Sequence, residues 1–434
     1  MINSISNHRK EIIKLFLKYF NKKKKEGINV FLSPFVYPCT WFRNLGYMKL
    51  QSFYLKNNQR LIFQYIREFI YIAKLHDYKL KEPRILNYSI PKNLYISWFN
   101  VDDIDKNFKF KDKYIPLLTK KNNYWFLLNI GKYFKYSNTK KNKSFFIFQK
   151  VTDKTFNYIY LIKIFLKVVL RNKFSLMKTM HQLNIDSVFS EIVVKDICNM
   201  IKKYNIKKII LPYEAQPFQK YLISILRKEF KTVKIVGYLN AIQPFPIHLF
   251  DNSNLPDKIY SSSPAQIKHL SNFFKWDRKK IFLKKSFRFE KKKSKFKNKI
   301  LLPFIITDPK IIINTIYNLI NIKPKNYFSK IDVIPHPSGI LGKDYKKFVN
   351  DLNEILKSFD KKFDKKNKKN MSLVVGSTSV IFEALELGLE VIHIVDQPAL
   401  ESLDERFWPT VKILKFNENV YKYTAEVNKS LIHH

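Results

Sequence analysis

Three short polar clusters in this sequence combine residue types that can bind a ligand or transfer a proton. Residues 212–218 carry Glu214, residues 335–339 carry His336, and residues 376–379 carry three consecutive hydroxyl side chains. A carboxylate in a dry cleft can act as a general base, and a histidine can donate a hydrogen bond to a phosphate. Each cluster directly follows a short apolar run typical of a buried strand. The pattern therefore predicts proton transfer and phosphate binding at the ends of strands.

The most explicit structural prediction concerns residues 372–395. The apolar run 373–375 predicts a buried strand, and 380–387 predicts a helix for which Gly388 is the stop signal. Residues 390–395 predict a second buried strand, in which His393 is expected to be a core residue. Strand, turn, helix and strand in so short a span indicate a unit of a parallel sheet.

The turn inside this unit consists of Gly376, Ser377, Thr378 and Ser379. It would lie at the carboxyl end of a strand and the amino end of a helix, where free N–H groups and the helix dipole favour a phosphate. Glu383, about one helical turn further on, could reach a ribose hydroxyl of the same nucleotide. An ordinary turn with a serine N-cap fits the same residues, and the sequence leaves both interpretations open.

Other candidate residues also have a structural alternative. His336 lies between two prolines that restrict its backbone, yet it could be a structural histidine. Glu214 is the candidate base, and its alternative role is a carboxylate stabilised by a helix start. Asp102 and Asp103 form a rival acidic pair after another predicted strand, and Arg288 could reach the same ligand or be a surface charge.

The elements that must position these residues alternate between strands and helices. The sequence therefore predicts an α/β fold with two facing Rossmann-like domains and a helical N-terminal extension. Residues 1–90 form the extension, with one strand expected at 29–35. Residues 91–288 form the first domain, 289–299 a basic linker, and 300–434 the second domain. Ligands of open α/β sheets bind outside the carboxyl ends of the strands, so a cleft between the domains would collect all three clusters.

The strong positive charge of the chain does not by itself identify the class of its binding partner. The 434 residues include 80 Lys and Arg against 35 Asp and Glu, a formal net charge of +45, and only ten of the cations are Arg. Lys spread over the whole chain fits a general composition bias, since recognition of planar anions favours Arg. Such a surface would still concentrate anionic nucleotides and favour acidic lipids. Nucleic acid is not expected as the main partner, because no nucleic-acid-binding motif is recognisable.

Cysteine usage and hydropathy indicate the compartment. Cys39 and Cys198 offer neither a disulfide framework nor a metal-binding spacing, which predicts a reducing environment. No apolar run reaches the roughly 18 residues of a membrane span, and the N-terminus lacks the pattern of a signal peptide. We therefore expect a cytoplasmic protein, and no HExxH, CxxC or P-loop motif supports a metal or a bound cofactor.

A family resemblance becomes visible in the C-terminal motifs. His336-Pro337, followed about 40 residues later by Ser377-Thr378-Ser379 and EALELG, resembles bacterial GT-B glycosyltransferases that use CMP-activated acidic sugars, the sialyltransferase and Kdo-transferase-like enzymes. The resemblance implies that His336-Pro337, the hydroxyl residues Ser377, Thr378 and Ser379, and Glu383 bind the donor nucleotide. Gly376 in the same turn and Arg288, because of its place just before the linker, are further candidates for this site.

A second resemblance covers the N-terminal half. The segments ISWFN, LPYEAQPF, VGYLNA, LPDKIY and KKSFRF are similar to proteins of surface-carbohydrate biosynthesis. The sialyltransferase-like families carry an acidic pair followed by glycine, whereas here Asp102-Asp103 is followed by Ile104 and Glu214 stands alone. The identity of the general base therefore stays open.

These resemblances imply a peripheral membrane protein at the inner face of the membrane that acts in lipopolysaccharide or capsule synthesis. It would be a metal-independent, inverting transferase that moves a nonulosonic acid or Kdo from a CMP-sugar to a glycan or glycolipid acceptor, without a further cofactor. The alternatives are a CDP-polyol phosphotransferase or a UDP-sugar epimerase on the same fold. A nonenzymatic basic protein that binds nucleic acid or acidic glycans is a third alternative.

Overall fold

The computed structural model of the chain describes residues 2–33, 70, 72–73, 75, 78–82, 93–99, 103, 110, 112, 114–115, 123–129, 145–150, 157–239, 244, 247–261, 264–284, 293–303, 306, 308–323, 331–336, 343–359, 363 and 370–425. Three of the predicted site residues, Asp102, Arg288 and Pro337, lie outside this part of the chain.

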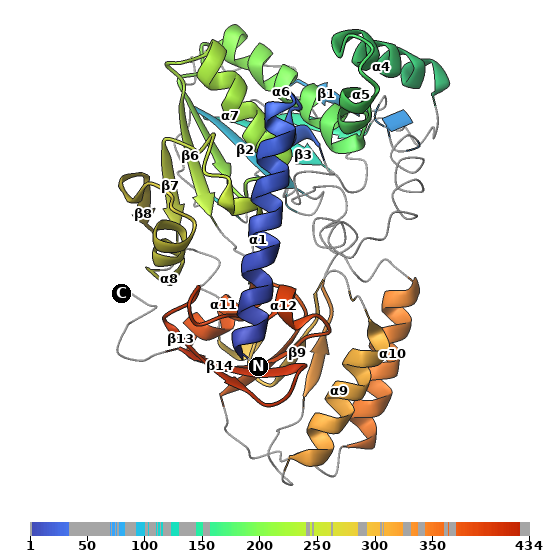
Figure 1. Ribbon diagram of the computed structural model, residues 1–434, viewed down its shortest axis with the longest axis vertical. Coiled ribbons are helices and arrows are strands. Elements are labelled where there is room, and N and C mark those ends of the chain that lie inside the picture. The colour runs from blue at the N-terminus through green and yellow to red at the C-terminus, as the bar shows by residue number, and fades with distance from the viewer. Residues whose placement is uncertain are drawn as a thin grey trace.

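Helices and strands alternate along most of the described chain (Figure 1). The α-helices are α1 (Ile2–Lys25), α4 (Tyr158–Arg171), α5 (Leu176–Gln182), α6 (Ile185–Tyr204), α7 (Pro217–Glu229), α8 (Pro264–Lys268), α9 (Pro309–Ile322), α10 (Lys343–Ser358), α11 (Val380–Glu386) and α12 (Pro398–Glu401). The strands are β1 (Tyr78–Lys81), β2 (Asn93–Phe99), β3 (Asn123–Asn129), β4 (Phe145–Lys150), β5 (Lys208–Pro212), β6 (Lys234–Leu239), β7 (Lys258–Ser261), β8 (Ile281–Leu283), β9 (Lys299–Leu301), β10 (Asp332–Ile334), β11 (Met371–Val375), β12 (Glu390–Ile394), β13 (Val411–Lys415) and β14 (Val420–Ala425).

The first sheet has the strand order β1-β4-β3-β2-β5-β6-β7-β8, and within it only the β1–β4 pair is antiparallel. The run from β4 to β7 has the order of a doubly wound nucleotide-binding sheet, in which the direction of winding reverses between β2 and β5. On one face, α6 and α7 share a core with Leu94 and Ile96 of β2. The carboxyl ends of β2 and β5 therefore flank the switch point, where such sheets bind ligands.

The second sheet has the order β10-β9-β11-β12-β14-β13. Its first four strands are parallel, whereas β14 pairs antiparallel with both β12 and β13. The winding reverses between β9 and β11, which makes their carboxyl ends a second switch point. The expected α/β class with two largely parallel sheets is thus confirmed. The domain boundaries stay predictions, and β1 joins the first sheet from within the stretch assigned to the helical extension.

The predicted unit at 372–395 is present as β11, α11 and β12. Gly388 ends α11 with a positive φ of 68°. Its N–H donates to the Leu385 carbonyl at 2.9 Å, and the Leu389 N–H donates to the Ala384 carbonyl at 3.1 Å. This pair of bonds is a Schellman motif, for which glycine is the preferred residue. Local sequence signals therefore account for this unit.

Helix α1 connects the two sheets (Figure 1). Near its N-terminus Arg9, which is 1% exposed, donates hydrogen bonds to the carbonyls of Pro398, Ala399 and Ser402 and lies 3.6 Å from the Asp404 carboxylate. The apolar side of α1, which carries Ile12, Phe16 and Phe20, is buried in the hydrophobic core that both sheets share. It therefore faces the protein rather than a membrane or a partner. At its other end the chain passes into a buried 3-10 turn, Val30–Leu32, which contacts α6 and α7.

The strand expected at 29–35 is therefore wrong for the described residues of that segment. Val30, Phe31 and Leu32 are all buried in succession. A strand would turn alternate side chains to opposite faces, whereas a tight helical turn lets three consecutive apolar residues pack against α6 and α7.

The two sheets also share a buried aromatic contact. Trp408, after α12, is fully buried and stacks on His269 of the first domain, with ring centroids 3.9 Å apart. Its indole N–H donates to the Pro244 carbonyl at 3.2 Å, and its ring contacts Phe382 of α11 at 4.2 Å. Residues of both sheets consequently belong to one continuous hydrophobic core.

Candidate functional site

The first candidate region is the turn that follows β5 at the switch point of the first sheet. Gln219, 1% exposed on α7, accepts hydrogen bonds from the backbone N–H groups of Glu214 at 3.0 Å and Gln216 at 3.1 Å. Its amide also donates to the Pro212 carbonyl at 2.7 Å. Ala215 adopts a left-handed φ of 54°, which is costly for a residue with a Cβ. One buried side chain therefore holds a strained turn in place.

Glu214 itself is half-buried on this turn. The Gln216 amide lies 3.4 Å from the Glu214 carboxylate, and the ring of His248 donates a hydrogen bond to the Glu214 backbone carbonyl. Burial lowers the pKa of His248 to about 3, and the positive charge of Lys220 adds to this effect. His248 is therefore a neutral donor, and the candidate base sits beside an uncharged ring.

The acidic residues after β2 differ from the predicted pair. Asp102 lies outside the described residues, whereas Asp103 is buried. Asp112, which sequence reasoning missed, is also buried and accepts from the N–H groups of Tyr114 at 2.5 Å and Ile115 at 2.6 Å. Burial raises the pKa of the Asp112 carboxyl, and the Asp103 charge raises it further. The signal was local, since Asp commonly accepts from amides two and three residues on.

The second candidate region is the turn that follows β11. Gly376 has a positive φ of 63°, and a Cβ at this position would lie 3.2 Å from the Pro303 ring, which follows β9. A left-handed backbone and a close neighbour both favour glycine. The turn therefore reaches the carboxyl end of the adjacent parallel strand, at the second switch point.

The three hydroxyl residues of this turn leave several polar groups without intramolecular partners. Within the described residues, the Ser377 hydroxyl oxygen is buried and has no hydrogen-bond partner. The same part of the chain offers no backbone acceptor for the N–H groups of Ser377, Thr378 and Ser379. Ser379 occupies the N-cap position of α11 without a capping hydrogen bond from its side chain. These donors suit an anion, and the alternative interpretation, a cap formed by the Ser379 side chain, is not observed.

A buried chain of hydrogen bonds fixes the carbonyl of Gly376. His393 Nε2 lies 2.8 Å from that carbonyl, and His393 Nδ1 lies 3.0 Å from the Tyr423 hydroxyl. Because a carbonyl can only accept, Nε2 carries the proton and Nδ1 accepts from Tyr423. The same hydroxyl accepts from the Leu403 N–H at 3.0 Å. Burial lowers the pKa of His393 to about 4, which keeps the ring in this neutral form.

His393 is fully buried, which confirms its prediction as a core residue. The sequence did not indicate its contact with Gly376, because the bond joins neighbouring parallel strands. The only sequence signal was a polar residue in an otherwise apolar strand, which must find a partner when buried.

Two glutamates lie near this turn in different settings. Glu383, the predicted ribose ligand, is buried in the first turn of α11. Glu401 accepts at 3.1 Å from the Asp396 N–H, and its other carboxylate oxygen lies 3.7 Å from the position a Cβ on Gly376 would take. Burial, followed by the charge of Asp396, raises the pKa of Glu401 well above its ordinary value. Sequence reasoning missed Glu401, which becomes adjacent only through the sheet.

His336 follows β10, the neighbour of β9. The backbone N–H of His336 donates to the Tyr345 hydroxyl at 3.0 Å, and that hydroxyl donates to the Pro303 carbonyl at 2.9 Å. Partial burial lowers the pKa of His336, which favours a neutral ring. Tyr345, on α10, was not predicted and ties the residues after β9 and β10 together. His336, Pro303 and Gly376 thus follow three adjacent parallel strands.

The loop after β6 contacts both candidate regions. Its His248 bonds the carbonyl of Glu214, and its Pro244 accepts from Trp408. Trp408 in turn contacts Phe382, which precedes Glu383 on α11. The base candidate and the helix after the hydroxyl turn are therefore linked through one loop and one buried tryptophan.

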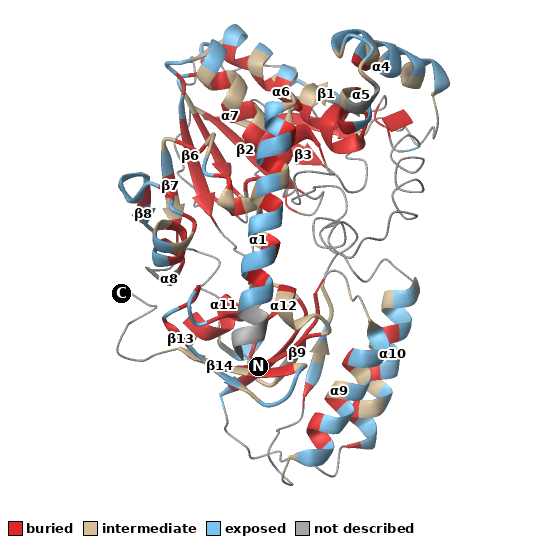
Figure 2. Ribbon diagram, in the orientation of Figure 1, coloured by how far each residue is buried: buried red, intermediate tan, exposed pale blue. Residues whose placement is uncertain are grey.

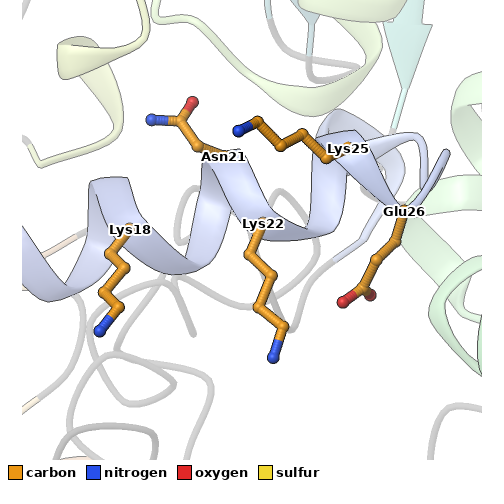
Figure 3. A pocket seen from close by; sticks show the side chains of 5 residues that line it. All are labelled: Lys18, Asn21, Lys22, Lys25 and Glu26. Atoms are coloured by element: carbon orange, nitrogen blue, oxygen red, sulfur yellow. The ribbon is translucent and has the colours of Figure 1, made fainter.

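A separate hollow of about 520 Å³ lies along α1 and is lined by Lys18, Asn21, Lys22, Lys25 and Glu26 (Figure 3). Glu26 forms an ion pair with Lys23 at 2.8 Å. Among the described residues, no salt bridge is found for Lys18, Lys22 or Lys25. The hydrogen bond from Lys23 and, to a smaller extent, the charge of Lys22 lower the pKa of Glu26. The hollow therefore suits an anionic ligand.

The described part of the chain contains neither a metal-binding cluster nor a membrane-spanning helix. Its residues include no group of three or more His, Cys, Asp or Glu side chains arranged to hold a metal ion. Within the same residues, no helix combines the length and the hydropathy needed to cross a bilayer.

Comparison with known proteins adds little to this geometry. No protein-family model matches the chain, and no curated protein matches its sequence. Among solved structures, a glycosyltransferase from Rickettsia africae ESF-5 is 14% identical, with 70% of this chain and 79% of that chain covered and a TM-score of 0.33. A TM-score this low does not establish a common fold or a common function.

Proposed function

We propose that this chain is a GT-B glycosyltransferase, metal-independent and inverting, that transfers a sialic-acid-like sugar or Kdo from a CMP-sugar to a cell-surface glycan. One observation carries the proposal. Each sheet has a switch point, and Glu214 and the hydroxyl turn at 377–379 each follow a strand that flanks one of them, whereas His336 follows β10, the neighbour of β9. Ligands of open α/β sheets bind at such points.

In this proposal the second sheet binds the donor. The hydroxyls and N–H groups of Ser377, Thr378 and Ser379, with His336, would hold the phosphate of the CMP-sugar. These donors would stabilise the negative charge on CMP as the bond between the sugar carbon and the phosphate oxygen breaks. The orphaned Ser377 hydroxyl supports this role, because a buried donor without a partner is costly. Pro337 is a further candidate from the resemblance, and Arg288 is one from its position before the linker.

The first sheet would supply the general base. Glu214 would accept the proton of the acceptor hydroxyl as that oxygen forms its bond to the sugar carbon. Asp103 remains the rival, and its neighbour Asp112 joins it as a second buried carboxyl. The half-buried position of Glu214 favours Glu214, because a base must reach the acceptor.

The proposed setting is the cytoplasmic face of a membrane. An acceptor glycolipid would be presented there, and the net charge of +45 would favour acidic lipids. Lipopolysaccharide and capsule synthesis are the processes that the resemblance suggests.

The first test measures thermal stability against CMP, CDP, UDP, GDP and ADP at fixed salt. A ligand at 100 times its dissociation constant stabilises the folded state by about 2.7 kcal/mol. We expect selective stabilisation by CMP that is lost in Ser377→Ala and kept in Ser358→Ala, a control serine exposed on α10. His336→Ala should abolish transfer and leave the melting temperature unchanged.

Other outcomes identify the alternatives. Preference for CDP or UDP would favour the polyol phosphotransferase or the epimerase, which product analysis separates. Equal small shifts with every nucleotide, unaltered by Ser377→Ala, would contradict a nucleotide site.

The hollow along α1 favours one second candidate function, nonenzymatic binding of acidic glycans. Lys18, Lys22 and Lys25 would then carry the binding. The affinity for a polyanion such as heparin should fall steeply as the salt concentration rises. It should also fall in the variant Lys18→Gln/Lys22→Gln and stay unchanged in Ser377→Ala.

A further inference from the structure

Helix α4 is apolar on two opposite sides. Its sequence, YIYLIKIFLKVVLR, contains no acidic residue. One side carries Tyr160, Leu161, Ile164 and Val168, which pack against the main core. A helix that is hydrophobic all round is normally buried, so the opposite side of α4 needs a physical explanation.

That opposite side faces solvent, and Figure 2 shows α4 as a largely pale blue helix at the edge of the molecule. Its exposed apolar side chains are Tyr158, Ile159, Ile162, Phe165, Leu166 and Leu170. Ile159 is 68% exposed and Leu170 is 61% exposed. Helical spacing of three and four residues places these six side chains in one continuous stripe. An exposed stripe of this size typically marks an interaction surface.

The residues that follow α4 extend the stripe at a conformational cost. Lys173 and Phe174 both have left-handed backbones, with φ of 51° and 59°. Hydrogen bonds from their N–H groups to the carbonyls of Leu170 and Val169 hold this turn. Phe174 is 75% exposed. A bulky residue in this conformation is a genuine outlier, and here the strained turn turns an aromatic ring toward solvent.

The charged residues of α4 itself and of the turn that follows it are all positive. No acidic residue occurs between Asp153 and Asp186. Lys163 and Lys173 are exposed, and neither has an acidic partner among the described residues. Lys167 and Arg171 pair instead with Glu191 of α6, which ties α4 to the body of the protein. An apolar stripe with cations beside it is complementary to a surface that is apolar inside and anionic outside.

We propose that the outer side of α4, together with Phe174, docks in the plane of an anionic lipid bilayer. Fourteen residues make a helix about 21 Å long, too short to span a bilayer, so α4 would lie in the interface. The apolar stripe would enter the acyl boundary while Lys163 and Lys173 reach the headgroups. A protein partner would need no such uniform positive charge. The inference goes beyond the proposed function and does not depend on the donor or the reaction.

The test uses the full chain and sedimentation with vesicles of phosphatidylcholine alone or with 30% phosphatidylglycerol, about the anionic content of many bilayers. Binding should require the anionic lipid. The variant Ile162→Ser/Leu166→Ser/Leu170→Ser should bind at least about tenfold more weakly. The matched control is Ile311→Ser/Tyr317→Ser/Ile322→Ser, which changes three exposed apolar residues of α9 and should bind like the wild type.

A second variant guards against misfolding. Lys163→Glu changes one exposed charge, should leave the melting temperature unchanged, and should weaken binding to the anionic vesicles by about fivefold or more. Three outcomes would overturn the proposal: no binding to either vesicle, equal binding by the α4 triple variant and the wild type, or a dimer in solution that the α4 variant dissociates. The last outcome would assign the stripe to a second copy of the chain. Nucleotide binding is independent of all these readouts.

Discussion

The polar turns at the two switch points are held in place by different kinds of contact. In each, a polar turn follows a parallel strand and contains a residue with positive φ, Ala215 after β5 and Gly376 after β11. The first turn is held mainly by Gln219, only a few residues ahead, and the ring of His248 adds one bond to the Glu214 carbonyl. The second is braced from distant strands, by His393 and Tyr423. Local bracing tolerates a strained alanine, whereas the second turn uses glycine and a buried relay.

This difference has a consequence for what each region can tolerate. A locally braced turn depends mainly on one side chain, and its geometry forms together with α7. A turn braced through the sheet depends on the registry of β11, β12 and β14. Disturbing that sheet anywhere along the relay should therefore reach the candidate phosphate site.

The largest expected effect breaks the local brace. Gln219→Leu leaves two backbone N–H groups and the Pro212 carbonyl without their partner, so we expect a loss of about 3 to 4 kcal/mol in the free energy of unfolding. Urea denaturation measures it. Gln266→Leu is the control, because Gln266 is equally buried but has a bond to Ser261 alone among those identified for its side chain, and it should lose about 1 kcal/mol. Equal losses in the two variants would remove the special role of Gln219.

A smaller effect is expected at the distant brace. His393→Leu leaves the Gly376 carbonyl and the Tyr423 hydroxyl without their ring partner, which should cost about 2 to 3 kcal/mol. It should also weaken CMP stabilisation, because the turn after β11 loses its anchor. Tyr423→Phe, which keeps the aromatic ring, should have a milder effect on both. Unchanged CMP binding in a folded His393→Leu would separate the relay from the site.

The smallest effect concerns pH and compares one histidine from each region. His248 and His393 have folded-state pKa values lowered to about 3 and about 4, mainly by burial. As pH falls below about 6.5, each of these histidines binds a proton in the unfolded chain but not in the folded chain. The free energy of unfolding therefore decreases as pH falls from about 6.5 to the folded-state pKa of each histidine, and above this range neither histidine affects it. Replacing either by Leu should reduce the slope of unfolding free energy against pH by about 1.4 kcal/mol per pH unit between roughly pH 6 and 4.5. Denaturation at several pH values measures the two slopes. A wild-type slope in both variants would mean that neither ring stays neutral.

Sequence patterns predicted the local features of both regions and little of what joins them. The unit at 372–395 follows from apolar runs, small turn residues and Gly388, all signals within a few residues. By contrast, the apolar spacing of residues 188–204 would allow Ser187 as the N-cap of α6, whereas Asn184 is the N-cap, because its side chain accepts from the Ser187 N–H at 2.9 Å. Both residue types make good caps, and the sequence alone does not choose between them.

The contacts that connect elements distant in sequence were beyond prediction. Tyr345, Glu401 and Trp408 gain their neighbours from strand order and domain packing, which depend on the whole chain. The strands β1 and β14 were missed for a related reason. Both join their sheets by antiparallel pairing with strands whose positions only the complete topology defines. Glu214, His336 and Ser377 could be singled out because polar residues after apolar runs are visible locally, while their catalytic and binding roles stay predictions.

The hydrogen bonds of Arg9 to the carbonyls of residues 398–402 affect when during synthesis the fold can be completed. Helix α1 leaves the ribosome well before its partner segment, because Arg9 bonds to the carbonyl of Ala399, 390 residues later. At about 5 to 20 residues per second, that partner emerges roughly 20 to 80 seconds after the helix. During this interval the apolar side of α1 lacks part of its binding surface and is open to chaperones. The contacts of α1 are thus completed only after residues 398–402 have been synthesised, and a chain that stops short of residue 398 leaves Arg9 without these carbonyl partners.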